Sequence, residues 1–302
     1  MTESTTATGT EMRSYYGHPV LKERVWTWEV PVYFWTGGIA GAVGILGLFA
    51  RAGGNERLAK TSVYVGAVFD LASPAFLISD LGRPERFLNM FRVFKVTSPM
   101  SVGSWILGVS SGASATAALL EATGRAKRVK LLAEGVSAVT GAPLATYTGA
   151  LVANTAVPAW HEARHELPFL FGASAAGSAG AVAAMLVPPA EAGPARRLAV
   201  AGALAANAIS LGSEARLGFV GEPYRHGTAG KLNAVSKAAT FAGAALRARR
   251  GRRGRAAAVA GGALVLAGEL ALRFSVFQAG KQSARDPRYT VIPQRRRLAS
   301  RT

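Results

Sequence analysis

Several ionisable side chains lie inside or at the ends of long apolar stretches of this sequence. Such groups are costly in hydrocarbon, so they pair with one another or mark a functional site. We call the side of the two chain termini side A and the opposite side side B. The groups that approach side A are Glu29, Asp80, Glu214, Lys237, Glu269 and Arg273, with Asp70 deeper, whereas Glu134 is the main one near side B. Carboxyl groups can relay protons, and the pattern predicts a polar site in the side-A half of a helical bundle, with a thin polar thread toward side B.

Structural roles also fit some of these residues. Glu269 and Arg273 are four positions apart with the acid first, so they can neutralise each other on one helix face. Lys237 can pair with Glu214. Glu29 follows a tryptophan and fits an interfacial residue in an aromatic belt.

The apolar stretches themselves set the fold class. Half of the 302 residues are hydrophobic and only 17% are charged, against about 25% in an average soluble protein. Eight stretches approach the length of about 20 residues that spans a bilayer, and they cover roughly 30–50, 58–79, 98–120, 131–156, 166–188, 195–217, 231–247 and 256–279. The sequence predicts an all-α, multi-pass protein of the cell membrane with eight transmembrane helices, although Lys237 interrupts the seventh stretch and leaves seven as the alternative. The membrane domain is expected over 29–280, between a polar tail (1–28) and a basic tail (281–302).

Composition also limits the cofactors and partners. The chain has no cysteine, which excludes an iron–sulfur cluster or a thiolate zinc site of its own. Its four histidines lie in polar stretches, so we expect no haem and no metal site. Part of the net charge of +18 is concentrated in residues 247–255. Such a basic loop is typical of a cytoplasmic anchor against anionic lipid rather than of nucleic-acid binding. Because this loop lies on side B, its charge favours side B as the cytoplasmic side.

Residues 78–107 combine a helix end, a Gly-Arg-Pro turn and an amphipathic segment. Ser98-Pro99 then provides an N-cap and a first-turn proline for the next helix. The segment should lie in the membrane interface, because its apolar side chains fall at helical spacing: Phe87, Met90, Phe91 and Phe94.

The stretch DLGRPERFLNMFRVFKVTSPMSVGSW (80–105) strongly resembles the NrfD-like family, the membrane subunit of polysulfide reductase and related complexes. Further similarity lies in WTWEVPVYFWTGGIAG (26–41), GAPLATYTGALVANTAVPAWHEARHELPFLF (141–171) and FQAGKQSARDP (277–287). The resemblance implies two four-helix bundles without haem. It also implies binding of a membrane quinone, either menaquinone or ubiquinone. A ferredoxin-like iron–sulfur subunit would dock on side A and relay electrons to or from a molybdopterin-type catalytic subunit.

Carried over by position, the resemblance implies a quinone pocket with Tyr33, Asp80, Arg83 and Tyr147, and we add Glu29 as a further candidate. The Tyr147 hydroxyl would donate to one quinone oxygen, and Asp80 would relay a proton while Arg83 keeps it ionised. Asp80 and Tyr147 are therefore the expected catalytic residues of a quinone-reactive subunit of an oxidoreductase complex.

Two other functions remain open from the residues. One is a proton- or ion-coupled transporter that uses Glu134, Asp70 and Lys237, and the other is an anchor that binds no quinone. Proton pumping by the oxidoreductase is a further hypothesis. Its route between the two sides would follow the polar residues of 131–156, namely Glu134, Thr140, Thr146 and Tyr147.

Overall fold

The computed structural model describes residues 19–22, 25–250 and 254–299, and every regular element within them is a helix. The predicted all-α class is therefore confirmed. The long helices are α1 (Glu29–Ala52), α2 (Glu56–Asp80), α3 (Pro99–Thr123), α4 (Lys127–Ala153), α6 (Leu167–Leu186), α7 (Gly193–Leu217), α8 (Gly227–Arg250) and α9 (Arg255–Arg285). The short ones are η1 (Pro84–Phe91), α5 (Pro158–Glu162), η2 (Glu222–Tyr224) and α10 (Arg288–Ala299).

Seven of the described helices are long and apolar enough to cross a membrane: α1, α2, α3, α4, α6, α7 and α9. The chain is a multi-pass membrane protein. The helix α8 has the length of a span but is too polar to meet the same criterion, because its sequence carries Lys231, Asn233 and Lys237. The predicted count of eight spans stays a prediction.

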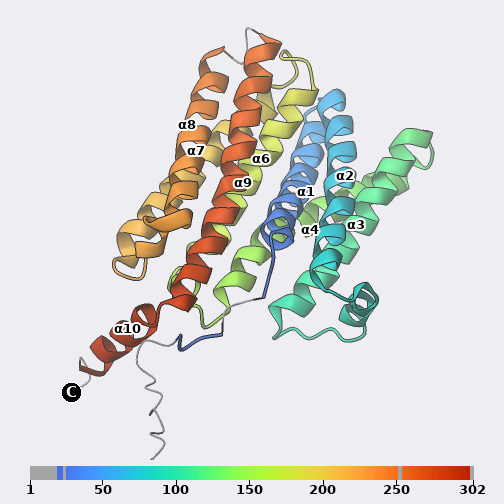
Figure 1. Cartoon of the computed structure of the whole chain (residues 1–302). Helices are drawn as coiled ribbons and strands as arrows, with labels where there is room; N and C mark the ends of the chain where they lie inside the picture. The colour runs from blue at the N-terminus through green and yellow to red at the C-terminus, as the bar shows by residue number, and fades with distance from the viewer. Residues whose placement is uncertain (1–18, 23–24, 251–253, 300–302) are drawn as a thin grey trace, which may run out of the picture.

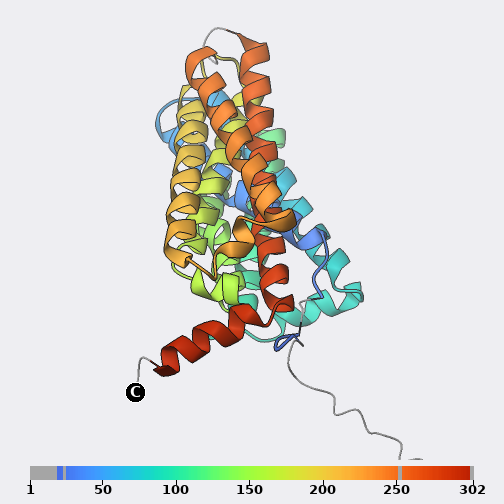
Figure 2. The same ribbon diagram turned by 60° about the vertical axis from the view of Figure 1, so that its left-hand side comes forward.

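Long helices that follow one another in the chain run alongside one another in opposite directions (Figure 1). Within α1–α4 each helix packs against the next, and α1 also packs on α4; α6–α9 form a similar group in which α6 packs on α7 and α9, and α8 lies along α9. The two groups meet where α1 packs on α6 and α4 on α6. Figure 2, turned by 60°, shows α8 and α9 side by side over most of their length. The contacts within each group are those that a four-helix bundle makes, and the two-bundle arrangement in the membrane stays a prediction.

Small residues allow the central helices to approach closely. Gly41 of α1 faces Gly141 of α4, and a Cβ atom at either would collide with the backbone of the other. Gly202 of α7 faces Gly177 of α6, and a Cβ atom at Gly202 would collide with the backbone of Gly177. Close backbone approach through small residues is a standard means of packing helices in lipid.

The segments at the side-A end differ in part from the prediction. Residues 84–91 form a 3₁₀-helix rather than an α-helix, with Pro84 in its first turn. The Ser98 cap is confirmed, because its hydroxyl accepts a hydrogen bond from the amide of Ser101 (3.4 Å). The tail expected after 280 is instead largely helical, since α9 continues to Arg285 and α10 then turns away from the bundle (Figures 1 and 2).

Candidate functional site

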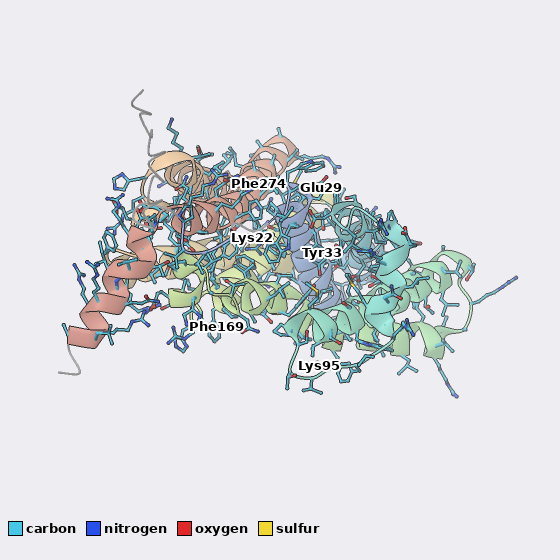
Figure 3. The ribbon with its side chains drawn as sticks, turned by 60° about the horizontal axis from the view of Figure 1, so that its bottom comes forward. Lys22, Glu29, Tyr33, Lys95, Phe169 and Phe274 are labelled. Atoms are coloured by element: carbon cyan, nitrogen blue, oxygen red, sulfur yellow. The ribbon has the colours of Figure 1, made fainter. Side chains whose placement is uncertain are left out.

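A cavity of about 100 Å³ lies among α1, α2, α3 and α4 near side A. Three of the predicted site residues line it, one from each of three helices: Tyr33, Asp80 and Tyr147. The other walls are mainly apolar: Trp26, Val30, Phe34, Leu77, Leu81, Met90, Met100 and Leu151, with Ser104 as a further polar group. Seen from this end of the molecule, Glu29 and Tyr33 lie on α1 near the middle, whereas Lys95 lies at the periphery (Figure 3).

Asp80 ends α2 and is tied to the segment that precedes α1. Thr27 donates to Asp80 Oδ1 from its amide (3.0 Å) and from its hydroxyl (2.7 Å). The same hydroxyl contacts Glu29 Oε2. A threonine hydroxyl has one hydrogen, so it donates to one of these two carboxyl groups at a time. Thr27 thus holds the carboxyl groups of Glu29 and Asp80 next to each other beside the cavity.

Tyr147 reaches the cavity from α4, one turn beyond Pro143. Its ring lies directly over Gly103 of α3, where a Cβ atom would come within 2.7 Å of Tyr147 Cδ2. Only glycine leaves room for the ring in this position. Tyr33 is almost fully buried, and its ring packs against Phe34 with centroids 5.7 Å apart.

Arg83 lies apart from the other predicted residues. It precedes η1 and its side chain is exposed. Within the described part of the chain no ion pair joins it to Asp80, whose Oδ1 is instead held by Thr27. Gly82 explains this placement, because its positive φ of 64° turns the chain outward directly after Leu81. The hydrogen bonds that hold Asp80 come from Thr27, and a role of Arg83 in quinone binding stays a prediction.

Two ion pairs were predicted as structural roles for Glu214 and Glu269, and the structure treats them differently. The predicted pair of Lys237 and Glu214 is confirmed, with 2.6 Å between Nζ and Oε1. Glu269 and Arg273 interact electrostatically as predicted, but no hydrogen bond joins them, since neither oxygen of Glu269 has a hydrogen-bonding partner among the described residues. Arg273 instead donates from Nη2 to the carbonyl of Phe171 (2.9 Å) and lies 3.8 Å from the centre of its ring.

Sequence reasoning missed Thr27, Ser104 and two methionines of the cavity wall. Thr27 lies two positions before Glu29, in a motif that the family resemblance already covered, and its hydroxyl was the available signal. Met90 and Met100 were assigned to an interfacial segment and a helix start rather than to a wall. No sequence pattern shows which side of such a segment faces a cavity.

A charged pair at the side-A end of the bundle stabilises the loops there. Glu166 precedes α6, and its carboxylate accepts two hydrogen bonds from Arg216, one of them 2.7 Å from Nη2 to Oε2. Partial burial by itself would raise the pKa of Glu166, but the hydrogen bond and positive charge of Arg216 outweigh it and hold that pKa below its ordinary value. This pair fixes the loop between α5 and α6 to the end of α7.

The donor set of the cavity fits a flat, weakly polar ring compound. Aromatic and thioether walls suit such a ring, while a few polar groups at defined points orient it. Tyr147 and Ser104 provide hydroxyl groups, and Asp80 Oδ2 has no protein partner in the described residues. In the same residues no group of three or more His, Cys, Asp or Glu side chains is placed to hold a metal ion.

The comparisons with known proteins agree with this geometry. A family model described as "Polysulphide reductase, NrfD" matches residues 18–198, which is more than half of the chain. The matched region contains α1–α4 and all the residues that line the cavity. No match was found among curated proteins. The chain therefore belongs to the NrfD family of polysulphide reductase membrane subunits.

Proposed function

We propose that this chain is the quinone-reactive membrane subunit of a multi-subunit oxidoreductase, and that the quinone binds in the cavity among α1–α4. The observation that carries the proposal is the convergence of Tyr33, Asp80 and Tyr147 on one apolar-walled cavity. When bound, a quinone takes up two electrons and two protons at its carbonyl oxygens, or releases them in reverse.

The residues of the cavity can serve both needs of this chemistry. The Tyr147 hydroxyl can donate a hydrogen bond to a carbonyl oxygen, and the walls exclude water around the ring. Asp80 can hold a proton on Oδ2, since Thr27 occupies only Oδ1. Glu29 contacts the same Thr27 hydroxyl, so a second carboxyl group lies next to Asp80 for proton transfer. Asp80 and Tyr147 are thus the proposed catalytic residues, and Thr27 is a positioning residue.

The electrons must come from another chain, because this one has no cysteine and no haem ligands in its apolar stretches. The cavity is lined by Met90 of η1 and by Trp26, both from segments at the side-A end. A ferredoxin-like iron–sulfur subunit docked on side A would lie near the cavity and would connect it to a molybdopterin-type catalytic subunit. Side A also carries the basic helix α10, whose sequence includes three consecutive arginines.

The alternative of a transporter that uses Glu134, Asp70 and Lys237 is less well supported by the geometry. Asp70 and Glu134 lie on α2 and α4, but Lys237 lies on α8 in the other group of helices. Its ammonium group is already paired with Glu214. These three residues therefore do not form one pathway.

The test is quinone-linked turnover of the complex purified from its native membranes. Removing the Tyr147 hydroxyl in Tyr147→Phe keeps the ring over Gly103 and deletes one hydrogen bond, which is worth about 0.5–1.5 kcal/mol. We expect turnover at limiting quinone to fall several-fold. Electron transfer from the catalytic subunit to an artificial soluble carrier should stay unchanged, because it bypasses the cavity.

Tyr64→Phe is the matched control, since Tyr64 lies on α2 and does not line the cavity. It should retain both activities. Unchanged quinone-linked turnover in Tyr147→Phe would show that the quinone binds elsewhere.

A further inference from the structure

A buried line of polar side chains leads from side B into the middle of the α1–α4 group. It begins at Arg51, which ends α1 and whose guanidinium contacts Glu56 at 2.5 Å. The Glu56 side chain is 70% exposed, so the line starts at the protein surface. Arg51 also holds the buried Glu134 of α4 with two hydrogen bonds, 2.6 Å from Nε and 2.9 Å from Nη2.

A small cavity continues this line. It measures about 20 Å³ and is lined by four polar side chains, those of Glu134, Ser137, Ser114 and Ser62, together with apolar residues of α1, α2 and α3. Such a volume is enough for a water molecule, and four polar groups around it can satisfy the two to four hydrogen bonds that a buried water makes. A proton can therefore pass between the carboxyl group of Glu134 and the serine hydroxyls.

The serines connect the small cavity to Asp70. Ser114 and Ser110 both donate to Asp70 Oδ2, the latter at 3.0 Å. The hydroxyl groups of Ser114 and Ser137 lie 3.0 Å apart, and because the one hydrogen of Ser114 is used on Asp70, Ser137 donates to Ser114. Asp70 is completely buried, and its Oδ1 has no hydrogen-bonding partner in the described structure.

A purely structural role does not account for this arrangement. Serine hydroxyls alone could join the helices, and an unpartnered carboxyl oxygen in a membrane interior is unfavourable. Buried polar groups without partners are rare and call for a functional explanation. A group that alternately binds and releases a proton is such an explanation.

From Asp70 the polar line continues toward the larger cavity. Ser73 lies one turn further along α2 and is buried, and its hydroxyl can donate either to the carbonyl of Phe69 on its own helix (2.7 Å) or to the hydroxyl of Thr36 (2.9 Å). Thr36 in turn donates to the carbonyl of Tyr33 (3.2 Å), and Tyr33 lines the cavity. Hydrogen-bonded side chains thus extend from the side-B surface to Asp70, and Ser73 and Thr36 lie between Asp70 and the backbone of Tyr33, although no hydrogen bond joins Asp70 to Ser73 among the described residues.

We propose that the quinone site exchanges its protons with side B through Glu134, the Ser114–Ser137 pair and Asp70. This inference rests on the proposed function. For each quinone reduced, two electrons arrive from the iron–sulfur partner and two protons move from side B to the two carbonyl oxygens; oxidation of the quinol reverses both movements. Because electrons and protons then reach the site from opposite sides, turnover separates charge across the membrane.

This route replaces the one expected from the sequence of α4 alone. The Thr140 hydroxyl donates to the carbonyl of Val136 (2.8 Å) and that of Thr146 to the carbonyl of Ala142 (3.0 Å). Both bonds turn back onto their own helix. Glu134 was correctly placed near side B, but its connection runs across α3 rather than along α4.

The test uses the complex reconstituted in sealed vesicles, with a pH-sensitive dye in the compartment that faces side B. Orientation is determined by protease cleavage of the C-terminal tail. In the wild type we expect turnover to change the pH on side B. Asp70→Asn and Glu134→Gln should each lower quinone-linked turnover at least about tenfold and abolish this pH change.

Ser137→Ala keeps both acids and removes only the link between them, so it guards against loss of folding in the acid variants. It should lower turnover and the pH change together. Thr116→Val is the matched control on α3, because its hydroxyl donates only to the carbonyl of Gly112 and its side chain is exposed. It should behave as the wild type.

Quinone binding is measured separately, by the quenching of tryptophan fluorescence on addition of a short-chain quinone. Trp26 in the cavity wall is the expected reporter. Absence of quenching in the wild type would overturn the proposed function itself. Normal quenching together with an undiminished side-B pH change in Asp70→Asn and Ser137→Ala would overturn only the proton route.

Discussion

Thr27 holds Asp80 by two hydrogen bonds to a single oxygen, one from its amide and one from its hydroxyl. The two residues are 53 positions apart, so the contact joins the segment before α1 to the end of α2. It leaves the second oxygen of Asp80 available to the cavity. A short polar residue outside any helix therefore orients the proposed proton carrier.

Replacing Thr27 with valine should weaken this orientation without changing the size of the side chain. The hydrogen bond from the backbone amide remains. The hydrogen bond lost with the hydroxyl group is worth about 1.5–3 kcal/mol when its carboxyl partner is ionised. We expect at least a several-fold fall in turnover at limiting quinone, with the artificial-carrier activity unchanged. Thr27→Ser restores the hydroxyl and should recover most of the turnover; an equal loss in both variants would contradict the role of the hydroxyl.

Gly103→Ala should displace the ring of Tyr147. The added methyl group would lie 2.7 Å from Cδ2 and 2.8 Å from Cζ of the ring, which requires the ring or the helix to move. We expect the effect of this variant on quinone-linked turnover to be at least as large as that of Tyr147→Phe. Combining the two substitutions should give much less than the product of their separate effects, because both act on one side chain.

Gly112→Ala on the same helix is the control for this experiment. A Cβ atom there meets nothing within 4 Å, and alanine favours a helix over glycine by about 0.5–1 kcal/mol. Its turnover should equal that of the wild type. If Gly103→Ala is equally active, the position of the Tyr147 ring does not matter for the reaction.

The pair of Glu166 and Arg216 predicts a pH dependence of stability. The pKa of Glu166 in the folded protein is below the ordinary value of 4.5, so the unfolded chain binds a proton first as the pH falls. The stabilisation is complete above about pH 4.5 and is lost as the pH falls through the lower, folded pKa. The melting temperature in detergent, determined between pH 7 and pH 3, measures this loss of stability.

In Arg216→Gln the stability should decrease less between pH 7 and pH 3 than in the wild type, because the substitution removes the charge that lowers the pKa of Glu166. At neutral pH the variant should be less stable than the wild type. Identical pH profiles of the two proteins would show that other acids govern acid unfolding.

The helices and the family were accessible from sequence because both depend on local patterns. Apolar stretches located the long helices to within a few residues at most of their ends, and the motif at 80–105 identified the family. Ser98-Pro99 correctly marked the start of α3. The helix α10 was missed, since its charged sequence has no apolar face of the expected period.

The cavity was accessible only in part. Tyr33, Asp80 and Tyr147 were expected together because of the resemblance, and the geometry brings them to one cavity. Arg83 was expected beside Asp80 because the two are adjacent in one motif, but a glycine with positive φ between them sends the side chains apart. The contacts of Thr27 and of Ser114 cross between helices, and no spacing along one chain segment encodes which helices become neighbours.

The polarity of α8 has a consequence for how the protein is assembled. Its polar side chains find partners on α7: Lys237 and Asn233 both donate to Glu214, and Thr240 accepts from Asn207. A helix too polar to enter lipid by itself can insert under two conditions. The helix before it must already provide hydrogen-bonding partners for its polar side chains, and an apolar helix after it must pack along its length. During synthesis, α8 should then remain at the translocon until α9 emerges, so that the two insert as a hairpin. A chain that stops after α8 would leave that helix exposed to the quality-control proteases of the membrane.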